Sequence, residues 1–135
     1  MTKAKLESIR EIKKELTMWE KRYKEIADDI APQVKINDGL PYSKTNAVGH
    51  PTEEKAIKLA DAAAQIEAKI QELRSTIIEI ESFILSVDDS IMRQILEYRC
   101  VYGMSWDDVA DKLGGNASNG MAKMAYYRFI QDKEL

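Results

Sequence analysis

One stretch decides the fold of the C-terminal part of the chain, Ser105-Trp106-Asp107-Asp108-Val109-Ala110-Asp111-Lys112-Leu113-Gly114-Gly115. The Ser105 side chain can accept hydrogen bonds from the first amide groups of a helix, and Asp108 stands three residues on, as in a capping box. Gly114 and Gly115 supply the left-handed residue with which many helices end. The stretch therefore predicts a short helix that begins after Ser105 and stops at Gly114.

Two further helices are expected around it. One opens near Asp88-Asp89-Ser90 and runs to Gly103, and the other covers Asn119 to Lys133. The spacings predict two apolar faces, one on each short helix: Trp106, Val109, Ala110 and Leu113, then Met121, Met124, Ala125 and Phe129. Two short helices joined by a glycine turn are typical of a helix-turn-helix, here a three-helix unit over residues 87–135.

Long helices are expected in front of this unit. Apolar residues recur every three or four positions from Leu6 to Ile30. They recur again from Ala56 to Ile84, where the spacing follows four uninterrupted heptad repeats. Such a repeat is typical of a coiled coil. We expect the two helices to pack antiparallel.

The residues between these helices carry turn chemistry. Asn37-Asp38-Gly39 and the prolines at 32, 41 and 51 predict a loop over 31–51, with Thr52 as the cap of the second helix. The sequence thus predicts an all-α chain. Residues 1–86 form a long helical hairpin or coiled coil with loop 31–51, and residues 87–135 form the helix-turn-helix domain.

The heptad stripe fits two interpretations, an intramolecular core or an interface between copies of the chain. A continuous helix over residues 52–86 would be about 50 Å long, and the first helix is shorter. The first helix cannot cover the whole stripe, which favours a homodimer or higher oligomer.

Composition limits the compartment and the partners. The single Cys100 forms no internal disulfide, and no signal peptide or membrane span is recognisable. The expectation is a cytoplasmic protein with no membrane partner. A net charge of −3 argues against coating nucleic acid non-specifically, although a local basic face remains compatible with it.

Enzymatic chemistry finds no support in the residues. His50, the only histidine, has no evident nucleophile or carboxylate partner, and Cys100 sits in an apolar context typical of a buried thiol. The pairs Asp88-Asp89 and Asp107-Asp108 fall at helix starts, where negative charge is favoured. We therefore expect no enzyme, no catalytic residue, no metal site and no cofactor.

The second short helix carries the residue types that contact duplex DNA. Asparagine can read adenine, arginine reads guanine or phosphate, and serine, tyrosine and lysine hold phosphates. The predicted DNA-binding residues are Asn116, Ser118, Asn119, Lys123, Tyr127 and Arg128, with Tyr126 as a further candidate. In the alternative interpretation, Asn116 and Asn119 only shape the turn and Tyr126 packs inside.

The acidic balance of the C-terminal residues argues against strong DNA binding by this part of the chain alone. From Asp88 onward, six Lys and Arg stand against eight Asp and Glu, and Ala122 and Met124 occupy positions where a DNA reader could carry cations. Pairing of two copies would raise a weak affinity.

The stretch from Ile91 to Ala110, with Leu96-Glu97-Tyr98-Arg99 and Tyr102-Gly103-Met104-Ser105-Trp106, is similar to the region-four helix-turn-helix of sigma factors. It resembles most the small phage and prophage regulators of Gram-positive bacteria, the ArpU and RinA type of late-gene regulator. Gly49-His50-Pro51-Thr52-Glu53-Glu54 before the heptad helix also looks like that group. The resemblance covers about residues 48–129 and implies a DNA-binding transcription activator, with the helix from Asn119 to Ile130 in the major groove.

Two other functions stay open at this point. Small terminase subunits of phage DNA packaging also join a helix-turn-helix to an oligomerising helical part. A sigma-like unit could instead be an adaptor that binds host RNA polymerase rather than DNA. The acidic balance and the region of Trp19 and Tyr23 motivate this last reading.

Overall fold

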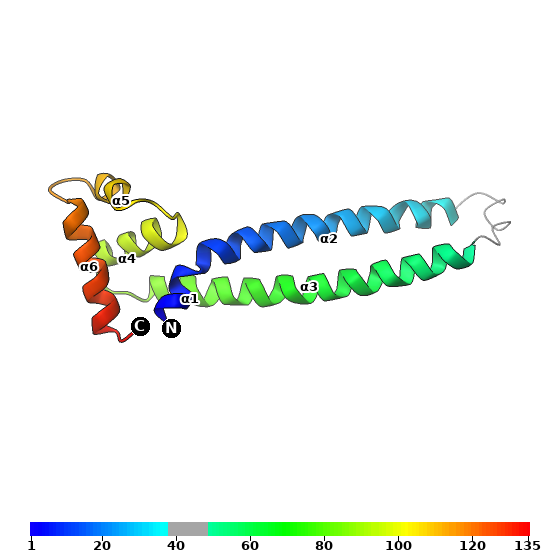
Figure 1. The fold of residues 1–135 in the computed structure, drawn as a ribbon, viewed down its shortest axis with the longest axis horizontal. Coiled ribbons are helices and arrows are strands. Elements are labelled where there is room, and N and C mark those ends of the chain that lie inside the picture. The colour runs from blue at the N-terminus through cyan, green and yellow to red at the C-terminus, as the bar shows by residue number, and fades with distance from the viewer. Residues whose placement is uncertain (38–48) are drawn as a thin grey trace. The chain divides into compact units, whose positions relative to one another are not determined.

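The computed structural model describes residues 1–37 and 49–135, and every regular element in these residues is helical (Figure 1). The prediction of an all-α chain is confirmed for this part. The elements in chain order are α1 (Lys3–Glu7), α2 (Ile9–Asn37), α3 (Gly49–Leu85), α4 (Ser90–Leu96), the π-helical turn η2 (Glu97–Val101), α5 (Trp106–Leu113) and α6 (Asn119–Asp132).

The described helices were compared with the requirements for a membrane span. Within residues 1–37 and 49–135, none combines the length and the apolar content that crossing a bilayer requires.

The chain divides into two compact units. The C-terminal unit comprises Met1–Lys14 together with Arg74–Leu135, and the middle unit comprises Glu15–Leu73. The domains inferred from the sequence, 1–86 and 87–135, stay a prediction. The composition of the C-terminal unit has a consequence for the site: the first residues of the chain pack with the last ones.

The first predicted helix is interrupted at Ser8, where one continuous helix was expected. Thr2 caps α1 by accepting a hydrogen bond from the Lys5 amide at 3.1 Å. The Ser8 hydroxyl donates to the Lys5 carbonyl at 2.6 Å. A serine side chain that bonds the backbone of the preceding turn competes with the helical ladder, and the break between α1 and α2 falls there.

The loop predicted over 31–51 was too long at both ends. Helix α2 continues past Pro32 to Asn37, since a proline removes one amide donor and the rest of the ladder remains. Helix α3 begins at Gly49, which puts Pro51 in the first turn, where an amide has no helical partner in any case. Thr52 is therefore inside α3 and is not its cap. Residues 38–48 and the side chain of His50 lie outside the described residues.

The heptad stripe of α3 is buried unevenly. In the C-terminal unit, Ile77, Ile80 and Ile84 are all less than a tenth exposed. In the middle unit, Ile70 and Leu73 are buried on α3, and the stripe is only half-buried at Ala56, Leu59, Ala63 and Ile66.

Small residues leave space beside the half-buried part of the stripe. A hollow of about 280 Å³ is lined by Trp19 of α2 and by Ala62, Gln65, Ile66 and Lys69 of α3. The Trp19 indole N–H donates to the Glu15 carboxylate at 2.9 Å, which holds the ring at the edge of this hollow.

Apolar side chains from both ends of the chain form the core of the C-terminal unit. Leu6 of α1 and Ile9 of α2 are fully buried. They join residues from α3 to α6, of which the most deeply buried are Ile80, Ile95, Leu96, Val109 and Tyr126. Helix α1 packs on η2, and α4, α5 and α6 pack on one another.

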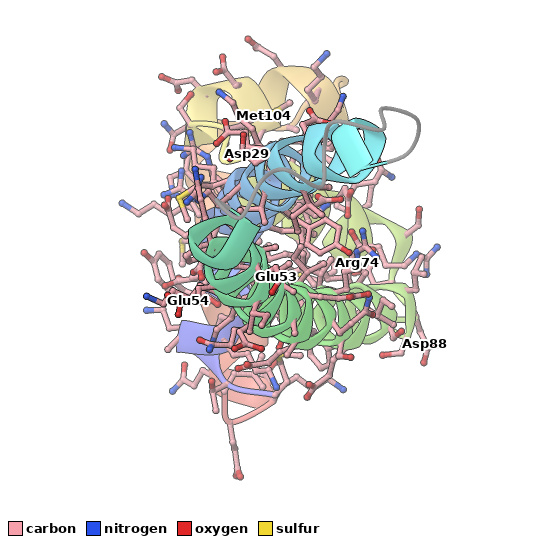
Figure 2. The ribbon with its side chains drawn as sticks, turned by 90° about the vertical axis from the view of Figure 1, so that its right-hand side faces the viewer. Asp29, Glu53, Glu54, Arg74, Asp88 and Met104 are labelled. Atoms are coloured by element: carbon pink, nitrogen blue, oxygen red, sulfur yellow. The ribbon has the colours of Figure 1, made fainter. Side chains whose placement is uncertain are left out.

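Charged side chains cover the outside of the helices. The acidic residues Asp29 of α2, Glu53 and Glu54 of α3, and Asp88 between α3 and α4 are all exposed, and Figure 2 labels them. Two ion pairs tie the first residues to α3 within the C-terminal unit, Lys5 with Glu79 at 2.6 Å and Lys13 with Glu81 at 2.9 Å. Both pairs are substantially exposed, so each contributes little to stability, on the order of 0–1 kcal/mol.

Because Leu6 is fully buried and Leu85 is 76 % exposed, the same truncation should have different costs at the two positions. Leu6→Ala should lower the free energy of unfolding by about 2–5 kcal/mol, through lost burial and a residual cavity. Leu85→Ala, the matched control, should change it by less than about 0.5 kcal/mol. Urea unfolding followed by circular dichroism measures both, and equal effects would contradict the packing of α1 in the core.

Candidate functional site

Helix α5 begins and ends as its sequence predicts. The Ser105 hydroxyl accepts a hydrogen bond from the Asp108 amide at 3.2 Å. Gly114 and Gly115 have positive φ angles of +71° and +59°, a range that favours glycine. Val109 and Ala110 are buried, and Trp106 and Leu113 are half-buried on the predicted face.

Helix α6 begins as predicted, but its buried face is a different one. The Ser118 hydroxyl caps it by accepting from the Met121 amide at 3.2 Å. The buried residues are Ala122, Tyr126 and Ile130, spaced four apart. Of the predicted apolar face, Ala125 and Phe129 are half-buried, while Met121 and Met124 are 52 % and 57 % exposed.

Two stripes of α6 compete for the core. Met121 and Met124 satisfy helical spacing as well as Ala122 and Tyr126 do, and only packing against the other helices selects between the two stripes. Ala122 is 1 % exposed, so it is a core position that could never have carried a cation for DNA. The outward face of α6 instead carries two methionines.

A hydrogen bond between two side chains links α5 and α6 across the turn. The Asn119 amide nitrogen, at the first position of α6, donates to the Asp107 carboxylate of α5 at 2.8 Å. Asn116 lies in the turn and is exposed. Asn119 therefore helps to shape the turn, as the alternative interpretation of the sequence allows, while it stays exposed at the start of the helix.

The predicted DNA-binding residues are all exposed, but they do not share one face. Asn119, Lys123 and Tyr127 follow one another at four-residue spacing and form a stripe along one side of α6. Arg128 is displaced from Tyr127 by about 100° around the helix. It lines a separate groove, so the structure does not bring it to the stripe.

The groove beside Arg128 has an apolar floor and a charged rim. Its volume is about 480 Å³, and its floor includes Met92 and the tilted ring pair of Phe83 and Phe129, whose centroids are 6.3 Å apart. The rim also holds Asp88, Asp89, Asp132 and Lys133. Carboxylates around Arg128 make this side of α6 a poor site for phosphate.

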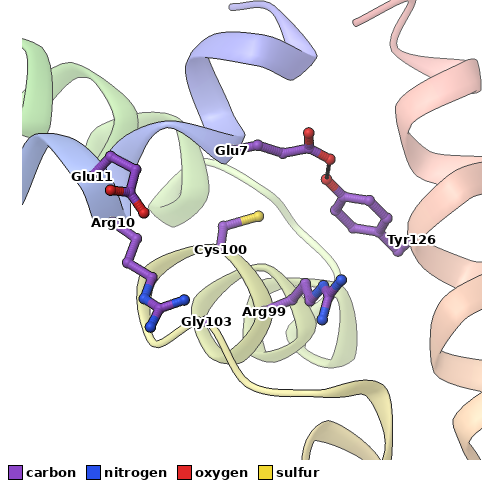
Figure 3. Close-up of a pocket in the computed structure, with 7 residues that line it drawn as sticks. All are labelled: Glu7, Arg10, Glu11, Arg99, Cys100, Gly103 and Tyr126. Atoms are coloured by element: carbon purple, nitrogen blue, oxygen red, sulfur yellow. Dashed lines mark hydrogen bonds between the residues drawn. The ribbon is translucent and has the colours of Figure 1, made fainter.

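Tyr126 is a core residue, and its hydroxyl reaches the N-terminal segment. It is 2 % exposed, and its hydroxyl donates to the Glu7 carboxylate at 2.7 Å (Figure 3). Burial, with the Glu7 hydrogen bond as the next cause, raises the pKa of Tyr126 above its ordinary range. Tyr126 is therefore unavailable to DNA, which is the alternative that the sequence left open.

Cys100 is a buried thiol, as its apolar context predicts. It is 5 % exposed, and burial raises its pKa to about 11. It lies at a hollow of about 290 Å³ that Glu7, Arg10, Glu11, Arg99, Gly103 and Tyr126 also line (Figure 3). A thiol that is protonated at neutral pH is a weak nucleophile.

Arg99 joins η2 to the start of α5. Its guanidinium donates to the Met104 carbonyl at 2.7 Å and lies over the Trp106 ring, 4.6 Å from the ring centroid. The Trp106 ring in turn contacts Tyr126 at 5.4 Å between centroids. These contacts fix α5 against α6 and so fix the direction in which the stripe of α6 points.

One residue beside the stripe was missed by sequence reasoning. The Lys3 ammonium lies 5.4 Å from the centroid of the Tyr127 ring. Lys3 is 124 positions away from Tyr127 in the sequence. The only available signal was the run of basic residues in Met1–Lys14, which by itself does not tell which helix it covers.

The described residues contain no group of three or more His, Cys, Asp or Glu side chains placed to hold a metal ion. No protein-family model, curated protein or solved structure matches the chain. The likeness to sigma region four therefore stays a prediction from residues 91–110.

Gly103 should resist substitution, because it has a φ of +67° and a β-carbon there would come within 2.6 Å of the Arg10 side chain. Gly103→Ala should lower the free energy of unfolding by about 1–3 kcal/mol. The matched control is Gly120→Ala in α6, where a β-carbon meets open space. That change should stabilise by about 0.5 kcal/mol. Thermal unfolding of the two variants checks this, and a neutral Gly103→Ala would contradict the close approach of Arg10.

Proposed function

We propose that the protein is a DNA-binding transcription regulator of the phage or prophage type, in which α5 and α6 form a helix-turn-helix and α6 enters the major groove. The observation that carries the proposal is the exposed stripe of Asn119, Lys123 and Tyr127 on a helix that Ser118 caps. These side chains supply an amide for base edges, a cation for phosphate and a phenol for phosphate.

Local construction supports the same proposal. Helix α6 follows α5 after a short turn with left-handed glycines, and its inner face packs on α4 and α5. That arrangement leaves the opposite face of the second helix outward, as major-groove recognition requires. The resemblance of Ile91 to Ala110 to sigma region four is in agreement with this.

We further propose that α2 and α3 pair as an antiparallel hairpin and that two copies of the chain associate through the middle unit. The support is the half-buried stripe of Ala56, Leu59, Ala63 and Ile66. Within the middle unit, the described apolar residues that are less than a tenth exposed are Ile26, Ile70 and Leu73. A core with so few buried residues would gain stability from packing against a second copy. Pairing would also add the avidity that a weakly basic DNA site needs.

A second candidate function is an adaptor that binds host RNA polymerase, and two observations favour it. Asp107 and Asp108 occupy the first turn of α5, where a DNA-bound helix-turn-helix often holds a phosphate. Met121 and Met124 are both more than half exposed on α6, and exposed methionines are frequent at protein-binding surfaces. Nothing on the described surface favours the third candidate, a terminase-like packaging component.

Association can be measured directly. Light scattering of the full chain should give the mass of a dimer. Ile66→Asp on the half-buried stripe should shift the mass towards the monomer, while Ile57→Asp, at a position that is 62 % exposed, should not. A ring of eight or more copies would instead favour the packaging component, and a monomer at all concentrations would exclude the proposed pairing.

DNA binding should depend on salt and on the stripe. The full chain should bind duplex DNA from upstream of phage late genes, and its affinity should fall steeply as the salt concentration rises. Lys123→Ala should weaken binding to all sequences and lower the salt slope by about one unit. Lys58→Ala, which removes the same charge from the exposed surface of the middle unit, should leave both unchanged.

The adaptor makes the opposite prediction. In that case the full chain binds no duplex DNA preferentially even at low salt, and it co-purifies with host RNA polymerase in the absence of DNA. Met124→Asp would then abolish co-purification. That pair of results would overturn the proposed regulator.

A further inference from the structure

The first residues of the chain supply basic side chains that offset the acidic surplus of the rest of the C-terminal unit. From Asp88 onward, acidic residues outnumber basic ones by two. The segment Met1–Lys14, which belongs to the same compact unit, has the opposite balance. Its basic residues are Lys3, Lys5, Arg10, Lys13 and Lys14, and its acidic residues are Glu7 and Glu11. The charge that α6 lacks is therefore available from α1 and the start of α2.

Several of these cations are already engaged. Lys5 pairs with Glu79 and Lys13 pairs with Glu81, both on α3. The Arg10 side chain lies against Gly103. Lys3 differs from them, because among the described residues it forms no ion pair and its ammonium lies over the Tyr127 ring.

The placement of Lys3 is set by the core and not by its own contact. Leu6 is fully buried, and Glu7 accepts the hydrogen bond of the Tyr126 hydroxyl. Leu6 and Glu7, which follow Lys3 by about one helical turn, together hold α1 beside α6. A cation over an exposed ring gains only about 0.5–1 kcal/mol, so the ammonium can leave the ring when a phosphate is offered.

The position of Lys3 extends the stripe of α6. Tyr127 is the last member of the stripe, and Lys123 lies one helical turn before it, about 6 Å along the axis. Lys3 and Lys123 thus stand near the same tyrosine, one from each end of the chain. Lysine and tyrosine side chains are among the groups with which proteins hold a DNA strand in register.

We propose that Lys3 is a DNA-contacting residue that holds a backbone phosphate beside Tyr127, so that the interface is built from both ends of the chain. The proposal rests on the proposed DNA-binding function. It adds a contact that belongs to α1 and lies outside the helix-turn-helix. The partner is the phosphate backbone of duplex DNA, which Lys3 would contact whatever the base sequence.

The test compares variants of the full chain in fluorescence-anisotropy titrations with duplex DNA from 50 to 200 mM salt. Lys3→Ala should lower the salt slope by about 0.9, so that its loss of affinity over this range is about threefold smaller than that of the unchanged protein. Lys3→Arg, which keeps the charge, should retain the slope. Lys14→Ala removes one charge from an exposed site on α2 and should also retain it.

The outcomes separate the two proposals. If the DNA affinity of the unchanged protein falls steeply with salt and Lys3→Ala has the same salt slope, the role of Lys3 is overturned. The proposed regulator function is then unaffected. Absence of DNA binding by the unchanged protein would overturn the regulator, and the role of Lys3 with it. Urea unfolding of Lys3→Ala should match the unchanged protein, since a half-exposed residue outside the core contributes little to stability.

Discussion

The packing of the first residues into the C-terminal core is the constraint on which the remaining features depend. Leu6 and Ile9 are fully buried there, and each such side chain is worth roughly 1.5–3 kcal/mol. The hydrogen bond from Tyr126 to Glu7, 119 positions apart, adds about 1–3 kcal/mol at most, since its acceptor is charged. Apolar burial therefore supplies most of the stabilisation. The hydrogen bond determines which turn of α1 faces α6, and so where Lys3 lies.

Structural features that depend on neighbouring residues were predictable from the sequence. Features that depend on packing between distant parts of the chain were not. The Ser105 cap of α5 and the positive φ of Gly114 at its end follow from local chemistry, and both were predicted at the correct residues, as was the start of α6 at Asn119. The inner face of α6 was predicted wrongly because two stripes of that helix are equally apolar. Only contact with the other helices selects Ala122 and Tyr126 over Met121 and Met124.

The candidate site divides in the same way. Asn119, Lys123 and Tyr127 were found from the sequence because they lie within one helix and repeat every four residues. Arg128 was grouped with them by proximity along the chain, but a displacement of about 100° per residue puts it at the groove with Phe83 and Asp88. Lys3 could not have been found, because no local pattern connects residue 3 with residue 127. The acidic balance of the C-terminal part is thus a poor guide to the charge beside α6.

The hydrogen bond between Asn119 and Asp107 constrains how the start of α6 would contact a base in the proposed DNA complex. An asparagine amide has two N–H donors and one acceptor, and adenine is read with one of each. The bond to Asp107 uses a single donor, so one N–H and the carbonyl oxygen of Asn119 remain. The bond also orients the amide, so less rotamer entropy would be lost in the proposed contact with a base. The same Asp107 charge would repel phosphates near the start of α5, so the proposed DNA complex would place its backbone contacts at the other end of the stripe, beside Lys123, Tyr127 and Lys3. In the proposed complex with DNA, base reading at the start of α6 and phosphate contacts further along it would therefore both follow from one local arrangement.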